Sequence, residues 1–137
     1  MDGPASGPPS PPCPRAALLA VADPSERRNL VALLEAEDID VTSVAETAAA
    51  ITLLSAGSFG IVLSELRLGG HADGAGLARW TLQNRPQVGL ILLADSFPWI
   101  PAGSPLAVVP VLLKPIDLAA LRRRVRRLLP LHELAAD

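Results

Sequence analysis

Apolar residues along the chain fall into short continuous runs separated by stretches with helical spacing. The runs contain mainly Leu, Ala, Val and Ile, and each is short enough for a strand that is buried on both faces. A shorter strand is indicated by Ile39, Val41 and Val44. The pattern therefore predicts five strands, at residues 17–22, 39–44, 61–63, 88–93 and 108–113.

The segment after the first run has the features of a helix start. Asp23 can cap the helix, Pro24 suits its first position, and Glu26 follows Asp23 by three residues, as in a capping box. Leucines at helical spacing then continue to about residue 37. Further helices are expected from Thr47, from the glycine-rich segment 69–76 to just before Pro86, and from Asp117, where the buried positions are Leu118, Leu121, Val125 and Leu128.

Strands that alternate with helices predict an α/β domain with a doubly wound, five-stranded parallel sheet. Functional side chains in such sheets lie just beyond the carboxyl ends of the strands. One connection breaks the rhythm, because residues 98–105 contain three prolines and a glycine. Since proline interrupts helices, we expect the fourth helix to be short or missing.

Composition adds few constraints. A chain of 137 residues, half of them hydrophobic, can bury the core of one domain, which we place at residues 15–130. The Pro-rich residues 1–14 are expected to be a disordered tail, and residues 131–137 a tail or the start of a linker. A net charge of −2 favours neither nucleic acid nor a membrane. The single Cys13 and the absence of a signal peptide or long apolar stretch predict a cytoplasmic protein.

The predicted strand ends bring a small set of polar residues together. Lys114 is the only lysine beside eleven arginines, and it ends the fifth strand directly before a proline. A lysine at a strand end often extends its ammonium group into water. Here the first and third strands end nearby, so we expect an ion pair with Glu65 and consider Asp23 a further candidate.

Two segments carry a resemblance to a known family. Residues 59–74 read FGIVLSELRLGGHADG, and residues 111–129 read VLLKPIDLAALRRRVRRLL. Over about residues 16–130 the chain resembles the receiver domains of two-component response regulators. The resemblance implies a flavodoxin-like sheet. In that family an acidic pair holds Mg²⁺, an aspartate accepts phosphate from a kinase histidine, and a Thr or Ser and a Lys hold the phosphoryl oxygens.

This sequence departs from the family pattern at most of those positions. Val21 and Ala22 stand at the acidic pair, with Asp23 one place beyond it. Glu65 stands at the phospho-acceptor position, and Ala94 at the Thr or Ser position. Val111 stands at the switch position, where the family often has an aromatic residue.

These departures predict a degenerate phospho-acceptor site in an atypical pseudo-receiver. We expect no enzymatic activity, no cofactor and no metal site, and Mg²⁺ binding is doubtful because carboxylates are missing. The predicted pair of Glu65 and Lys114 would hold one state without phosphorylation. Two alternatives remain open: a working receiver in a phosphorelay with Asp73 or Asp95 as substitute acceptor, and a flavodoxin-like domain that binds a small ligand, although the chain lacks a phosphate-binding loop.

A partner surface is predicted where the fourth connection, the fifth strand and the last helix meet. Phe97 and Trp99 are candidate anchors there, and Arg122, Arg123 and Arg126 are candidate basic contacts for a protein partner or a second copy of the chain. The competing interpretations are that the aromatic residues fold inward and that the arginines form a solvated helix face. Direct nucleic-acid binding is not expected, because stacking aromatic residues and further basic loops are missing.

Overall fold

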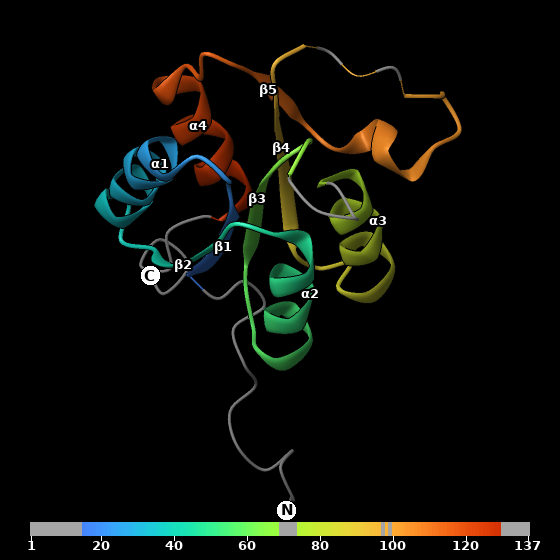
Figure 1. Ribbon diagram of the computed structural model, residues 1–137, viewed down its shortest axis with the longest axis horizontal. Coiled ribbons are helices and arrows are strands. Elements are labelled where there is room, and N and C mark those ends of the chain that lie inside the picture. The colour runs from blue at the N-terminus through green and yellow to red at the C-terminus, as the bar shows by residue number, and fades with distance from the viewer. Residues whose placement is uncertain (1–14, 69–73, 97, 99, 130–137) are drawn as a thin grey trace, which may run out of the picture.

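The computed structural model describes residues 15–68, 74–96, 98 and 100–129 (Figure 1). The predictions for both tails and for Phe97, Trp99 and Asp73 lie outside these residues. The strands are β1 (Ala16–Ala20), β2 (Asp40–Val44), β3 (Ile61–Glu65), β4 (Gly89–Ala94) and β5 (Val111–Leu113). The helices are α1 (Pro24–Ala36), α2 (Thr47–Ala56), α3 (Gly74–Asn84) and α4 (Leu118–Leu128), with a 3₁₀ turn, η2, at Pro105–Val108.

The five strands form one parallel sheet in the order β2-β1-β3-β4-β5. Helices α1 and α4 cover one face of the sheet, and α2 and α3 cover the other (Figure 1). The predicted doubly wound α/β fold is therefore confirmed. Among the described helices, none has both the length and the hydrophobicity needed to cross a bilayer.

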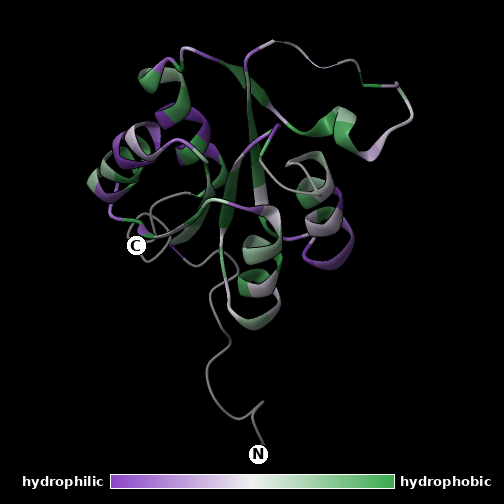
Figure 2. Ribbon diagram, viewed as in Figure 1, coloured by the Kyte–Doolittle hydropathy of each residue, from purple (hydrophilic) through white to green (hydrophobic). Residues whose placement is uncertain are grey.

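Each face of the sheet has its own hydrophobic core. Alternate residues of the central strands point to opposite faces, so Leu19 and Leu63 pack under α1 and α4, whereas Leu18 and Val62 pack under α2 and α3. Figure 2 shows the hydrophobic colour concentrated on the strands and the hydrophilic colour on stretches of the surrounding helices α1, α3 and α4. This arrangement explains the continuous apolar runs in the sequence, because the central strands are buried on both faces.

Two aspartates cap the helices α1 and α4, which begin near the carboxyl ends of the strands. The Asp23 carboxylate accepts a hydrogen bond of 2.7 Å from the Glu26 N–H, and Pro24 occupies the first turn of α1. The Asp117 carboxylate accepts from the N–H groups of Ala119 and Ala120 at 3.0 and 3.2 Å. Both caps satisfy N–H groups that lack partners within their own helix.

The fourth connection contains no α-helix among its described residues. The side chain of Ser104 accepts from the Leu106 N–H at 3.1 Å, and Pro105 begins the 3₁₀ turn. The prediction of a missing or shortened fourth helix is confirmed. The predicted start of the fifth strand at residue 108 is wrong, because Val108 belongs to the turn and β5 begins only at Val111.

Arginine side chains join the C-terminal ends of α1 and α4. Arg15 donates hydrogen bonds to the carbonyl oxygens of Glu37, Asp38 and Leu129, at 2.5, 3.2 and 3.1 Å. Arg126 binds both carboxylate oxygens of Glu37, at 2.7 and 3.1 Å. Arg122 lies 3.3 Å from the same carboxylate. Two of the arginines predicted to contact a partner are thus engaged within the molecule, a contact that sequence spacing alone could not reveal.

The contact between Glu37 and Arg126 makes the packing of α1 on α4 sensitive to acid. The hydrogen bond from Arg126 lowers the pKa of Glu37 below its ordinary value of 4.5. A carboxyl group with a lowered pKa in the folded state contributes stability above the pKa of the unfolded chain. That contribution is lost as the pH falls through the folded-state pKa.

We expect the variant R122Q/R126Q to lose stability less steeply than the wild type between neutral pH and pH about 3. Urea unfolding at a series of pH values measures this slope. The matched control is R123Q/R127Q, since neither arginine has an ion-pair partner among the described residues. The control should keep the wild-type slope, and equal slopes in both variants would contradict the assignment.

Candidate functional site

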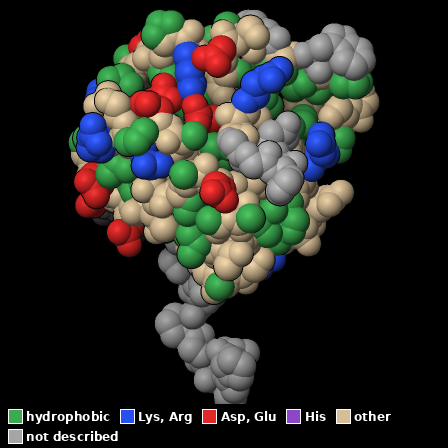
Figure 3. Space-filling model, viewed as in Figure 1, with side chains coloured by type: hydrophobic (Ala, Val, Ile, Leu, Met, Phe, Trp, Pro, Cys, Tyr) green, Lys and Arg blue, Asp and Glu red, His purple; other side chains and the backbone are tan. Residues whose placement is uncertain are grey.

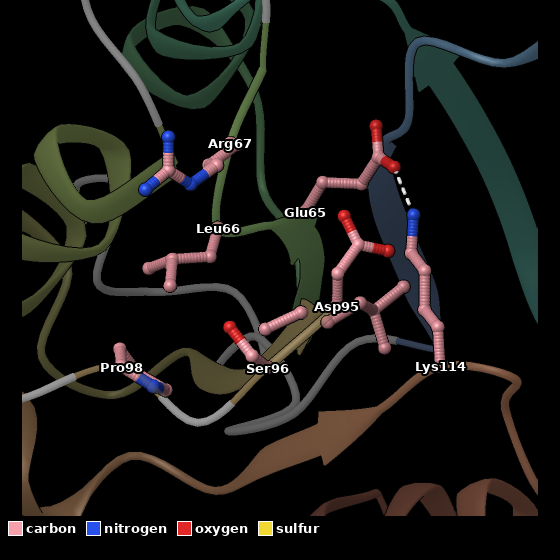
Figure 4. A pocket seen from close by; sticks show the side chains of 9 residues that line it. Glu65, Leu66, Arg67, Asp95, Ser96, Pro98 and Lys114 are labelled. Atoms are coloured by element: carbon pink, nitrogen blue, oxygen red, sulfur yellow. Dashed lines mark hydrogen bonds and ion pairs between the residues drawn. The ribbon is translucent and has the colours of Figure 1, made fainter.

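The carboxyl ends of β3, β4 and β5 open onto a cavity of about 380 Å³. Figure 4 shows the Glu65 and Lys114 side chains directed toward each other at one side of it, with Arg67, Ser96 and Pro98 on the opposite side. Acidic and basic side chains lie close together in the space-filling view, above the end of the sheet (Figure 3). The cavity is therefore lined largely by polar groups and lies where a doubly wound sheet carries its site.

Glu65 is the last residue of β3 and is buried, with 8% of its surface exposed. Its Oε1 accepts a hydrogen bond of 2.8 Å from the backbone N–H of Ala22, two residues beyond the end of β1. Its Oε2 accepts a hydrogen bond from the Lys114 ammonium group. Both carboxylate oxygens thus have a donor within the protein, as a buried charge requires.

Lys114 directly follows β5, and a backbone hydrogen bond to β4 fixes its position. Its N–H donates to the Ala94 carbonyl at 2.8 Å, and the peptide bond to Pro115 is cis. The Nζ atom also lies 2.8 Å from Oε1 of Glu26. Burial lowers the pKa of Lys114, but the hydrogen bonds to Glu26 and Glu65 outweigh this effect, so the pKa is raised above 10.5 and the side chain is charged at neutral pH.

The predicted contact between Glu65 and Lys114 is present, and a second carboxylate accompanies it. Asp23, the other candidate predicted from the sequence, is not a partner of Lys114. Its exposed side chain caps α1 instead. Glu26 takes that place because it lies in the first turn of α1, beside the ends of β1 and β5. The sequence places Glu26 three residues after Asp23, which was interpreted as a capping box and not as a contact with Lys114.

The other two predicted site positions carry no polar side chain. Ala94, the last residue of β4, is buried in the cavity wall and offers no hydroxyl group. Val111 begins β5, is half-buried, and packs against the apolar cluster under α2 and α3. The buried hydroxyl of Ser64 donates to the Glu65 carbonyl at 2.9 Å.

A glycine places α3 against the end of β3. Gly74 begins α3, and its N–H donates to the Leu66 carbonyl at 2.9 Å. A Cβ atom at this position would lie 1.7 Å from the Glu65 carbonyl oxygen. Only glycine allows this approach, so residue 74 helps to position Glu65. This role was not predicted from the sequence, because Gly74 falls within a glycine-rich segment.

The residues present do not fit an Mg²⁺ ion. Such an ion prefers octahedral oxygen ligands and needs carboxylates that are free to bind it. Here Glu65 and Glu26 face the ammonium group of Lys114, and Asp23 faces the α1 N-terminus. In the described part of the chain, no three His, Cys, Asp or Glu side chains form a group that could hold a metal.

Comparison with solved structures identifies this architecture. The response regulator TrrA from Thermotoga maritima is similar with a TM-score of 0.75 and 19% identity, over 83% of this chain and 98% of that one. A response regulator receiver protein from Sinorhizobium medicae has a TM-score of 0.74 and 25% identity, over 82% and 92%. The chain has the receiver-domain fold. The signal receiver domain of an HD domain-containing protein from Pseudomonas fluorescens is similar too, with a TM-score of 0.74 and 24% identity over 84% and 93%.

This receiver fold is recognised through its structure. No family model matches the sequence, and no curated protein matches it. The positions that the receiver resemblance associates with chemistry hold Val21, Ala22, Glu65, Ala94 and Lys114. Of these, only the lysine is the residue type that the resemblance implies.

Proposed function

We propose that this receiver domain signals through protein contacts and does so without phosphorylation or Mg²⁺. The observation that carries the proposal is the pair of Glu65 and Lys114. In a working receiver the lysine holds a phosphoryl oxygen. Here the Lys114 ammonium group forms ion pairs with the carboxylates of Glu65 and Glu26. The second oxygen of the Glu65 carboxylate accepts a hydrogen bond from the Ala22 N–H.

The chemistry of phosphoryl transfer supports the same conclusion. Transfer depends on positioning and on neutralising the charge of the phosphoryl group with a metal ion and cations. TrrA was crystallised in complex with Mg²⁺–BeF. In the present chain the carboxylates that would bind the metal are replaced by Val21 and Ala22, and Ala94 supplies no hydroxyl. The domain therefore lacks three of the groups that phosphorylation requires.

The Glu65 side chain also supplies a fixed negative charge near the place of a phosphoryl group. Glutamate is one methylene longer than aspartate, so its carboxylate extends farther from β3. Lys114 and the Ala22 N–H bind that carboxylate. We propose that this holds the β5 end of the domain in one state at all times, and that its output surface is presented constitutively.

We expect no stoichiometric acyl phosphate after incubation with Mg²⁺ and acetyl phosphate. Intact-mass spectrometry measures the adduct, and NMR amide shifts with Mg²⁺ and beryllofluoride measure binding. The matched control is a phosphorylatable receiver domain treated in the same tube. A full mass increase of one phosphoryl group would overturn the proposal.

Peptide mapping of any adduct would distinguish the competing receiver hypothesis. Asp95 is exposed and lines the same cavity, so it is the described candidate for a substitute acceptor. The variant D95N removes only this carboxylate. A phosphoryl adduct that disappears in D95N would establish a working receiver with a displaced acceptor, and the constitutive state would then be wrong.

A further inference from the structure

Beside the outer edge of β5, helix α4 presents three arginines that have no ion-pair partner within the described residues. The five arginines of α4 divide into two groups. Arg122 and Arg126 face Glu37 of α1. Arg123, Arg124 and Arg127 are exposed and line a groove of about 230 Å³ with Ala120 and Leu112. The groove therefore lies between α4 and β5, with a partly apolar floor and a basic wall.

Beside the groove, β5 offers backbone groups for pairing. It is the last strand of the sheet and bonds only to β4. The Pro110 carbonyl and the Lys114 N–H point toward β4, at 2.9 Å from Leu92 N and 2.8 Å from Ala94 O. By the alternation of a strand, the N–H and C=O groups of Val111 and Leu113 point outward.

The two sides of this edge differ in chemistry. Leu112 packs with the α1 and α4 side, whereas Val111 packs with the α2 and α3 side. Leu113 is 36% exposed. A strand added along β5 would therefore place alternate side chains against the arginines and the others against Val111 and Leu113.

We propose that the β5 edge and the α4 arginines form a docking site for an extended acidic segment of a partner protein. The segment would add a strand to β5, with acidic side chains toward Arg123, Arg124 and Arg127 and apolar side chains toward Leu113. Pro110 and the residues after Lys114 limit the backbone pairing to a short length. The arginines therefore provide much of the recognition through charge complementarity.

A second copy of the chain fits this site poorly. Two-fold pairing of β5 with β5 brings the same surface of both copies together. It would place the arginines of one α4 near those of the other, and like charges across an interface disfavour association.

The docking site rests on the proposed function in one respect only, which is that the domain acts through contact with another protein.

Titration of the full chain with a peptide of alternating glutamate and valine tests the site. We expect saturable binding that weakens with salt and shifts the Val111 and Leu113 amide signals in NMR spectra. The variant R123E/R127E should bind roughly tenfold more weakly or worse. The matched control R28E/R79E makes the same charge change at exposed arginines of α1 and α3 and should bind as the wild type does. Circular dichroism confirms that both variants fold.

Three results would overturn the docking site. Equal loss of binding in both variants would show attraction to net charge alone. Tighter binding of duplex DNA or single-stranded RNA than of the peptide would identify a nucleic-acid surface. A doubled mass in light scattering that R123E/R127E abolishes would identify a homodimer. A phosphoryl adduct in the mass assay would overturn the proposed function and leave these binding results unchanged, so the two failures are distinguishable.

Discussion

Replacing Lys114 with methionine is expected to destabilise the domain by about 3 kcal/mol at neutral pH, near the lower end for removing one partner of a buried ion pair. Methionine keeps most of the volume and removes the charge. The Glu65 carboxylate then keeps only the Ala22 N–H as a donor. Water cannot easily replace the lost donor, because only 8% of the residue's surface is exposed. The negative charge must then be buried with a single donor, which accounts for the expected cost.

Urea unfolding of a small set of variants separates this effect from lost packing. E26Q removes the less buried partner of Lys114, whose side chain is 28% exposed, and should cost no more than about 1 kcal/mol. K114M/E65Q removes both charges of the buried pair and should recover a large part of the stability lost in K114M. A cost in K114M no greater than that in E26Q would show that Glu65 does not depend on the ammonium group.

The parts of the fold that depend on local pattern could be predicted from the sequence. Central strands buried on both faces give continuous apolar runs, and the Asp23 and Asp117 caps mark helix starts directly. The contact between Glu65 and Lys114 also followed, because the order of a doubly wound sheet brings the ends of the third and fifth strands to one edge. The strand order of the fold therefore predicted the contact, although the two residues are far apart in the sequence.

The remaining features depend on tertiary contacts that have no local signal. Leu118 was predicted to be buried but is 47% exposed, at the first position of α4. Glu37 and Arg126 are far apart in sequence, and only the packing of α1 on α4 brings them together. Helical spacing predicts which residues share a face, but it does not predict which neighbouring element that face meets.

Gly74 shows how a glycine can be misread when only its loop context is considered. Glycines in a polar segment usually indicate a flexible turn. Here the constraint is the close approach of α3 to the end of β3, where Glu65 must be held for Lys114. The mutation Gly74→Ala is therefore a test of how rigidly the strand end determines the site.

We expect Gly74→Ala to destabilise the domain by about 3 kcal/mol, at the upper end for overpacking, because the clash is with backbone. The added Cβ would lie 1.7 Å from the Glu65 carbonyl oxygen and 2.8 Å from its carbon, so either α3 or the end of β3 must move. Thermal and urea unfolding measure the cost, and NMR shifts of Glu65 and Lys114 report the movement. The matched control is Gly103→Ala, whose Cβ would meet no atom within 4 Å and should leave stability nearly unchanged. If Gly74→Ala were as stable as the control, α3 would be free to shift, and the position of the Glu65 carboxylate would have to be fixed by Lys114 and the Ala22 N–H alone.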